Sequence, residues 1–196
     1  MVLPRRPANR YQNELRHPMT QAAISPTQPL ASELVLTGDI RPPAALGIFD
    51  SGIGGLSVAR ELWRQHPHLS FRYLADQRHA PYGTRPLEEI RFLCEAITRF
   101  LLTFHVRVVV VACNSASAAA LYALRERFPE TAFVGMEPAL KPAAEQTLTG
   151  RIGIVATAAT FSGQPYAGVV ARYGRNVQIL PLVCPEFVPL VEAGNI

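Results

Sequence analysis

The chain has 196 residues, a formal net charge of +4 and 48% hydrophobic residues, which is sufficient for one core or for one and a half domains. No apolar run approaches the roughly 18 residues of a membrane span, and no basic stripe with interleaved aromatics is present, so we expect neither a membrane nor a nucleic-acid partner. The 3 cysteines do not form a disulfide framework, which favours a reducing, cytoplasmic compartment.

Residues 1–44 differ in composition from the rest of the chain. They hold 7 of the 17 prolines and show no periodic apolar pattern, so we predict a disordered arm rich in Pro and Arg. The arm contains no apolar stretch of the kind that a signal peptide requires. Its arginines leave a targeting segment or a partner-binding tail as the alternative.

From Leu46 onward the pattern alternates between strands and helices. Short apolar runs predict strands at 46–50, 70–74, 108–112, 132–135, 151–157 and 177–180. Helical periodicity predicts helices at 56–65, from Pro86 to about Phe104, up to about Phe128, at 141–148 and at 186–193.

Repeated strand–helix units favour an α/β fold with a mainly parallel sheet. We expect a complete or nearly complete parallel-sheet domain at 45–136, followed by part of a second, similar α/β domain at 137–196. The runs LGIFDSG and IGIVATAAT both pass from an apolar strand into small and hydroxyl residues, which hints at two related halves.

The stretch VVVVACNSAS at 108–117 carries the strongest chemical signal. It predicts a buried strand that ends in Cys113, Asn114 and Ser115 and continues into an Ala-rich helix. Ligands bind at this edge of open α/β sheets. Unpaired N–H groups and the helix dipole there favour a thiolate, so Cys113 is a candidate reactive group. The alternative is a small buried hydrophobe, as most free cysteines are.

The loop from Asp50 to Gly55 allows three interpretations. Gly52 and Gly54 fit part of a dinucleotide fingerprint, with Asp76 near the expected acidic position. A second interpretation is a small-ligand loop, in which Asp50 orients a reacting group and Ser51 contacts the ligand. The third is a plain glycine-rich turn. The small-ligand interpretation is favoured, because Asp50 would lie unfavourably beside a pyrophosphate.

Five motifs in order carry a family resemblance: FDSGIGGLS, APYG, ACNSAS, IGIVATAATFS and FVPLVEAG. From Leu46 to its end the chain resembles glutamate racemase, in the cofactor-independent aspartate/glutamate racemase superfamily. The resemblance implies two α/β domains that hold the substrate between them. It also implies an isomerase that interconverts L- and D-glutamate and supplies D-glutamate for peptidoglycan, and hence for cell-wall biogenesis and cell shape. Aspartate stays open as a substrate.

Racemisation requires one group to remove the α-proton and another to return a proton on the opposite face, and tuned thiols suit this work. The resemblance makes Cys113 one of the two catalytic cysteines, with Asp50 orienting it. It also implies a set of substrate-binding residues: Asp50, Ser51, Tyr82, Gly83, Asn114, Ser115, Thr157 and Thr160. Asp76 and Glu192 match acidic positions of the family near its active site.

One departure from the family concerns the second base. In glutamate racemases the second cysteine lies in a Gly-Cys-Thr-His motif, which these 196 residues do not contain. Cys184 has another context, so we predict structural roles for Cys184 and Cys94, and solvated roles for His66, His68, His79 and His105. We therefore expect this polypeptide alone to lack racemase activity.

No cofactor or metal is expected. A pyridoxal-phosphate route requires a Schiff-base lysine, and the sole lysine, Lys141, lies in a surface-like context. The expected partner is a small-molecule substrate, glutamate, and a homodimer stays open. Three alternatives remain: a nucleotide-binding α/β module, a one-thiol decarboxylase of the same superfamily, and a non-catalytic interaction protein.

Overall fold

The computed structural model describes residues 46–195, so the arm predicted at residues 1–44 lies outside the described residues. Four parallel strands form the first sheet in the order β2-β1-β3-β4. Their bounds are β1 (Leu46–Asp50), β2 (Phe71–Ala75), β3 (Val108–Val111) and β4 (Ala132–Gly135). The predicted α/β fold with a parallel sheet is confirmed, and each strand lies within one residue of its predicted position.

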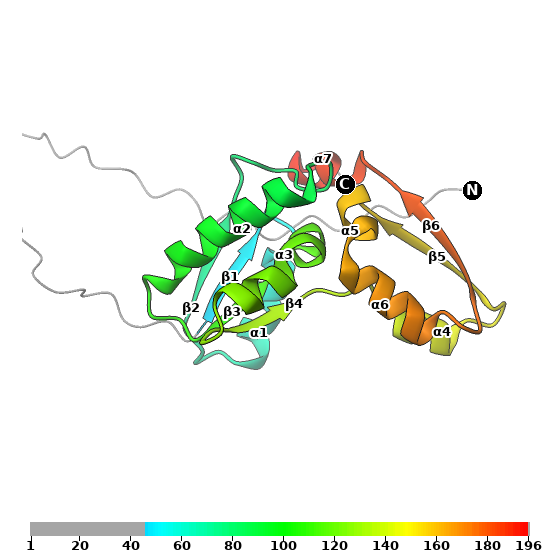
Figure 1. The fold of residues 1–196 in the computed structure, drawn as a ribbon, viewed down its shortest axis with the longest axis horizontal. Helices are drawn as coiled ribbons and strands as arrows, with labels where there is room; N and C mark the ends of the chain where they lie inside the picture. Colours follow the sequence, from blue (N-terminus) through cyan, green and yellow to red (C-terminus); the bar gives the residue numbers. More distant parts are fainter. Residues whose placement is uncertain (1–45, 196) are drawn as a thin grey trace, which may run out of the picture. The chain divides into compact units, whose positions relative to one another are not determined.

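Three helices cover the two faces of this sheet (Figure 1): α1 (Leu56–Gln65), α2 (Leu87–Leu102) and α3 (Asn114–Arg127). Neighbouring residues of a strand point to opposite faces. Phe49 accordingly packs in a core with Ile90 of α2 and Leu124 of α3, whereas Ile48 packs against Ala59 of α1. Because both faces are covered, the central strands are apolar on both sides, which explains the run of valines in β3.

A second sheet of two parallel strands, β5 (Arg151–Ala156) and β6 (Gln178–Val183), lies in the C-terminal third of the described chain. It is accompanied by α4 (Leu140–Gln146), α5 (Ala158–Ser162), α6 (Gln164–Tyr173) and α7 (Phe187–Glu192). Leu140, Ile152 and Val169 form its buried centre, so α4 and α6 pack on β5. None of the helices in the described range is long and apolar enough to cross a membrane.

Helices α5 and α6 are not predicted by the sequence pattern, and β6 is longer than predicted. Two local signals mark the missed helices. The Thr157 hydroxyl accepts a hydrogen bond from the backbone N–H of Thr160 and so caps α5, and Pro165 occupies the first turn of α6. At five residues, α5 is too short to display a clear apolar face.

The strand order places the site. The chain passes from β1 to β2 on one side and then returns to β3 on the other, so β1 and β3 flank a topological switch point. Ligands bind beyond the carboxyl ends of the strands at such a point. Asp50 ends β1 and Cys113 follows β3, and in this parallel pair Phe49 lies beside Val111. Both side chains therefore reach the same edge.

Replacing Leu124 with alanine should destabilise the fold by about 2–5 kcal/mol, because a fully buried leucine leaves a cavity between α3 and the sheet. Leu148→Ala is the matched control, since Leu148 is 100% exposed. Urea unfolding of the two variants measures the difference. Equal free energies of unfolding would contradict this account of the core.

Candidate active site

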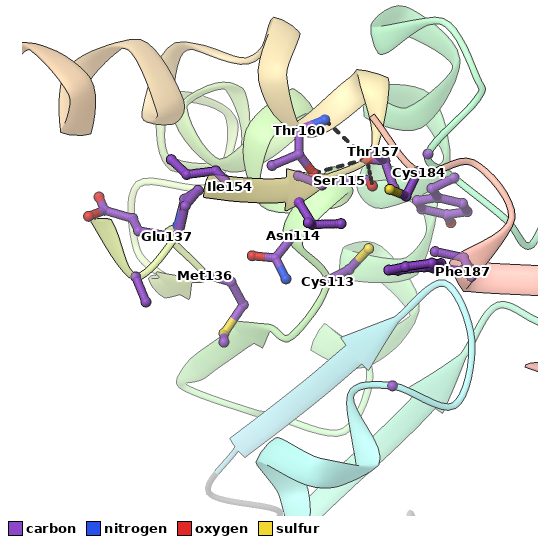
Figure 2. Close-up of a pocket in the computed structure, with 18 of the residues that line it drawn as sticks. Cys113, Asn114, Ser115, Met136, Glu137, Ile154, Thr157, Thr160, Cys184 and Phe187 are labelled. Carbon is purple, nitrogen blue, oxygen red and sulfur yellow. Dashed lines mark hydrogen bonds between the residues drawn. The ribbon is translucent and has the colours of Figure 1, made fainter. Parts of the chain in front are cut away.

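A cavity of about 740 Å³ lies at the carboxyl edge of the first sheet and extends along β5. Figure 2 shows Cys113, Ser115 and Thr157 on its polar part, with Met136 and Ile154 farther along. The structure brings together most of the predicted site residues on this cavity: Asp50, Ser51, Tyr82, Gly83, Cys113, Asn114, Ser115, Thr157, Thr160 and Glu192. Asp76 is the one predicted site residue that does not line it.

Cys113 occupies the N-cap position of α3, where the extended β3 strand turns into the helix. Its sulfur accepts a hydrogen bond from the backbone N–H of Ala116 at 3.4 Å and lies 3.6 Å from the Ser51 hydroxyl oxygen. The residue is only 6% exposed, yet it lines the cavity. The thiol is thus held at the base of the cavity by groups from two neighbouring strand ends.

The expectation of a thiolate at Cys113 is wrong for the free protein. Burial and, second, the negative charge of Asp50 raise the pKa of the Cys113 thiol to about 11. The hydrogen bonds from Ala116 and Ser51 lower this pKa, but they are outweighed. The free-energy cost of removing the thiolate from water is larger here than the stabilisation that the N-terminus of α3 gives it. Cys113 is therefore a neutral thiol at pH 7 whose ionised form is a strong base.

Asp50 is buried at 6% exposure, and one of its carboxylate oxygens accepts the backbone N–H of Gly55 at 2.8 Å. Gly55 permits this approach, because a Cβ there would come within 2.7 Å of the Asp50 Cβ. The carboxylate thus occupies the start of α1, where a dinucleotide would place its phosphates. This geometry favours the small-ligand interpretation of the loop over the dinucleotide one.

Hydroxyl groups form the opposite side of the polar part. The Ser115 and Thr157 hydroxyl oxygens lie 2.9 Å apart, and those of Thr157 and Thr160 lie 3.0 Å apart (Figure 2). The loop of Gly83 joins them, because its carbonyl accepts the backbone N–H of Ala159 at 3.2 Å. Hydroxyl groups from α3 and from the start of α5 therefore meet at one point of the cavity.

Asp76 does not line the cavity, but it forms a hydrogen bond with Tyr82, which does. The Tyr82 hydroxyl donates to the Asp76 carboxylate at 2.6 Å, and Nδ1 of His79 lies 2.8 Å from the same carboxylate. Tyr82 is 1% exposed, and burial and Asp76 raise its pKa far above the ordinary range, so it is a neutral anchor. His79, for which a solvated role was predicted, is partly exposed, and its ring also contacts Asp76.

Cys94 is fully buried in the first core, which confirms its predicted structural role. Cys184 lines the same cavity as Cys113 and is only partly buried, so its structural role stays a prediction. Figure 2 draws Cys184 among the residues that line the cavity. Cys184 follows β6 and reaches this edge because β6 pairs in parallel with β5. The sequence did not reveal this pairing.

The lining of the cavity is acidic and lacks cationic side chains. Asp50, Glu137 and Glu192 contribute carboxylates, and no Lys, Arg or His is among the lining residues of the described chain. Such a site suits a ligand with an ammonium group. Any carboxylate of that ligand would have to bind hydroxyl and backbone N–H groups instead of a cation. A zwitterionic amino acid meets both conditions.

A model of the family described as Asp/Glu/Hydantoin racemase matches residues 57–187. The chain belongs to this family. It is 46% identical to glutamate racemase of Pseudomonas aeruginosa over 153 residues. These residues make up 78% of this chain and 58% of that protein. Over 151 residues it is 48% identical to glutamate racemase of Herpetosiphon aurantiacus, covering 77% of this chain and 59% of that protein.

Solved racemases share the fold. Glutamate racemase of Escherichia coli, solved with L-glutamate and the activator UDP-MurNAc-Ala, has a TM-score of 0.70 and 38% identity over 78% of this chain and 57% of that one. The Thermus thermophilus enzyme, solved with β-chloro-D-alanine, has a TM-score of 0.62 and 40% identity over 79% and 57%. The chain thus spans less than three fifths of the length of these relatives.

The Asp50 charge can be tested through the reactivity of Cys113, since only the thiolate reacts with iodoacetamide. With a pKa of about 11, labelling of Cys113 should rise through pH 10 without a plateau. Asp50→Asn removes one cause of the raised pKa, so labelling at pH 8 should become roughly threefold to tenfold faster. Peptide mass spectrometry measures the rates.

Glu137→Gln is the matched control, because Glu137 lines the cavity but is not among the groups that shift the Cys113 pKa. Its labelling profile should coincide with that of the parent chain. An unchanged profile in Asp50→Asn would contradict the assigned role of Asp50.

Proposed function

We propose that this protein acts in the racemisation of glutamate, with Cys113 as the group that exchanges the α-proton on one face of the substrate. The observation that carries the proposal is the position of the Cys113 sulfur. It lies 3.6 Å from the Ser51 hydroxyl oxygen and lines an acidic cavity, to which residues 46–195 contribute further hydroxyls but no cationic side chain. Membership of the racemase family and the glutamate racemase relatives support the same function.

The protein would hold the substrate through its positive ammonium group and through its negative carboxylate groups. Asp50 would face the ammonium group, because its carboxylate is buried and its negative charge acts on Cys113. The hydroxyls of Ser115 and Thr157, and Ser51 on the other side, would donate to carboxylate oxygens. Neutral donors suffice, since a carboxylate makes strong hydrogen bonds with uncharged partners.

The chemical step would be a proton transfer. The Cys113 thiolate takes the α-proton and becomes a thiol, and the electron pair of the broken C–H bond stays on the substrate as a carbanion delocalised into the carboxylate. A proton then returns to that carbon. A thiol with a pKa of about 11 is seldom ionised at neutral pH, but its thiolate is a better match for a weakly acidic C–H bond than an ordinary thiolate would be.

The wider role follows from the resemblance. D-glutamate made in this way would enter peptidoglycan synthesis, and the enzyme would work in the cytoplasm without a cofactor. We further propose that the two sheets are the cores of two α/β domains, divided near residues 136–137, with the substrate between them. The Gly83–Ala159 and Ser115–Thr157 hydrogen bonds would then cross the domain boundary.

Exchange in D2O tests the role of Cys113. We expect the purified 196-residue polypeptide to replace the α-proton of one glutamate enantiomer with deuterium, at a rate that rises with pH, and to retain the configuration, because these residues lack the second-base motif. Cys113→Ser should lower the exchange rate about 10²- to 10⁴-fold. Proton NMR measures exchange, and chiral chromatography measures racemisation.

Cys94→Ala is the control, since it removes a buried thiol outside the cavity. It should retain exchange after its folding has been checked. Undiminished exchange in Cys113→Ser would overturn the proposal. Racemisation by the polypeptide would contradict the single-base prediction, and its loss in Cys184→Ser would identify the other base.

A further inference from the structure

Glu192, at the end of α7, contacts residues that lie far from it in the sequence. One of its carboxylate oxygens accepts the backbone N–H of Ile53 at 2.9 Å, and the other accepts the side-chain amide of Gln77 at 3.2 Å. Ile53 lies 139 residues away in sequence, in the turn between β1 and α1. The last helix of the described chain is therefore tied to the loop that holds Asp50.

The turn is shaped for this carboxylate. A Cβ on Gly52 would come within 1.9 Å of one Glu192 carboxylate oxygen and 2.6 Å of the other, so only glycine leaves the space that Glu192 fills. The Gly52 carbonyl is fixed by the Tyr73 hydroxyl, which donates to it at 3.1 Å. The partly exposed carboxylate thus lies against the Gly52 backbone, in the space that a side chain at this position would fill.

Little else holds α7 in place. No residue of this helix is buried, and Phe187 and Val191 remain 56% and 37% exposed although both line the cavity. Within the described residues, the side-chain hydrogen bonds that join α7 to the first sheet and its loops both come from Glu192. An element with few buried apolar contacts opens at low cost in free energy.

We propose that Glu192 is a positioning residue: its carboxylate latches α7 onto the Gly52–Ile53 turn and so closes one wall of the cavity that holds Cys113. Opening the latch would swing Phe187, Val188 and Val191 away from the cavity and admit a ligand. The inference deepens the function proposed above, since the same cavity is the site of that reaction. It assigns Glu192 a mechanical role, distinct from a direct part in proton transfer.

Access to Cys113 measures the latch without any substrate. Glu192 is not among the groups that shift the Cys113 pKa, so a change in iodoacetamide labelling on altering Glu192 reports access and not ionisation. Labelling is followed by peptide mass spectrometry on the full 196-residue chain. Cys94, which is fully buried in the first core, serves as the internal marker of global unfolding.

Two variants should open the latch from its two sides. Glu192→Ala removes the acceptor, and Gly52→Ala places a Cβ where the carboxylate lies. Each should speed Cys113 labelling roughly tenfold, because loss of the Glu192 hydrogen bonds to Ile53 and Gln77 shifts the opening equilibrium by about that factor. Labelling of Cys94 should stay at the parent rate.

Three further variants should keep the parent rate. Glu192→Gln retains an oxygen that can accept the Ile53 N–H, so it should restore closure. Glu186→Ala removes an exposed acid on the same helix that makes no capping hydrogen bond. Gly54→Ala adds a Cβ to the same turn at 3.4 Å from Asp50, an ordinary contact.

The latch is overturned if Glu192→Ala and Gly52→Ala leave Cys113 labelling unchanged. It is also overturned if Glu192→Gln opens the cavity as fully as Glu192→Ala, since the negative charge and not the hydrogen bond would then matter. Parallel labelling of Cys94 would mean global unfolding and would likewise overturn a local latch. Because no glutamate is present, these outcomes are independent of whether the proposed racemase chemistry holds.

Discussion

The structure depends on the parallel pairing of β1 with β3. This pairing carries Asp50 and Cys113 to the same edge of the sheet, where the chain turns into α1 and α3. A carboxylate and a thiol are thereby enclosed together, and each is held by backbone N–H groups at a helix start. The cavity, its acidic character and the raised pKa of Cys113 all follow from this arrangement.

Two opposing effects meet at Cys113. The N-terminus of α3 and the Ser51 hydroxyl stabilise a thiolate, whereas burial and Asp50 destabilise it, and the second pair prevails. The result is a protonated thiol in the free protein. A bound ammonium group beside Asp50 would cancel part of the opposing charge, so ligand binding itself would make the base easier to form.

The local parts of this arrangement could be predicted from sequence. The valine run and the polar cluster after it indicated β3, α3 and a site at their junction, because both signals lie within ten residues. Contacts between distant residues could not be predicted in this way. The positions of Cys184 on the cavity and Glu192 on the Gly52 turn depend on how β6 pairs and where α7 lies.

The charge balance at Cys113 also lay beyond the sequence. A helix start predicts a lowered thiol pKa, and burial together with the negative charge of Asp50 reverses that expectation. The motif match predicted Asp76 near the active site, and in the structure its carboxylate accepts a hydrogen bond from Tyr82 and does not line the cavity. The short helices α5 and α6 carried capping and proline signals without a clear period.

The central claim is that Cys113 lies where the substrate binds. Labelling of Cys113 by iodoacetamide at pH 9, with and without glutamate, tests it most directly. We expect glutamate to slow labelling of Cys113 in a saturable manner while the fully buried Cys94 remains unlabelled. Labelling of Cys113 at the same rate at every glutamate concentration would contradict it.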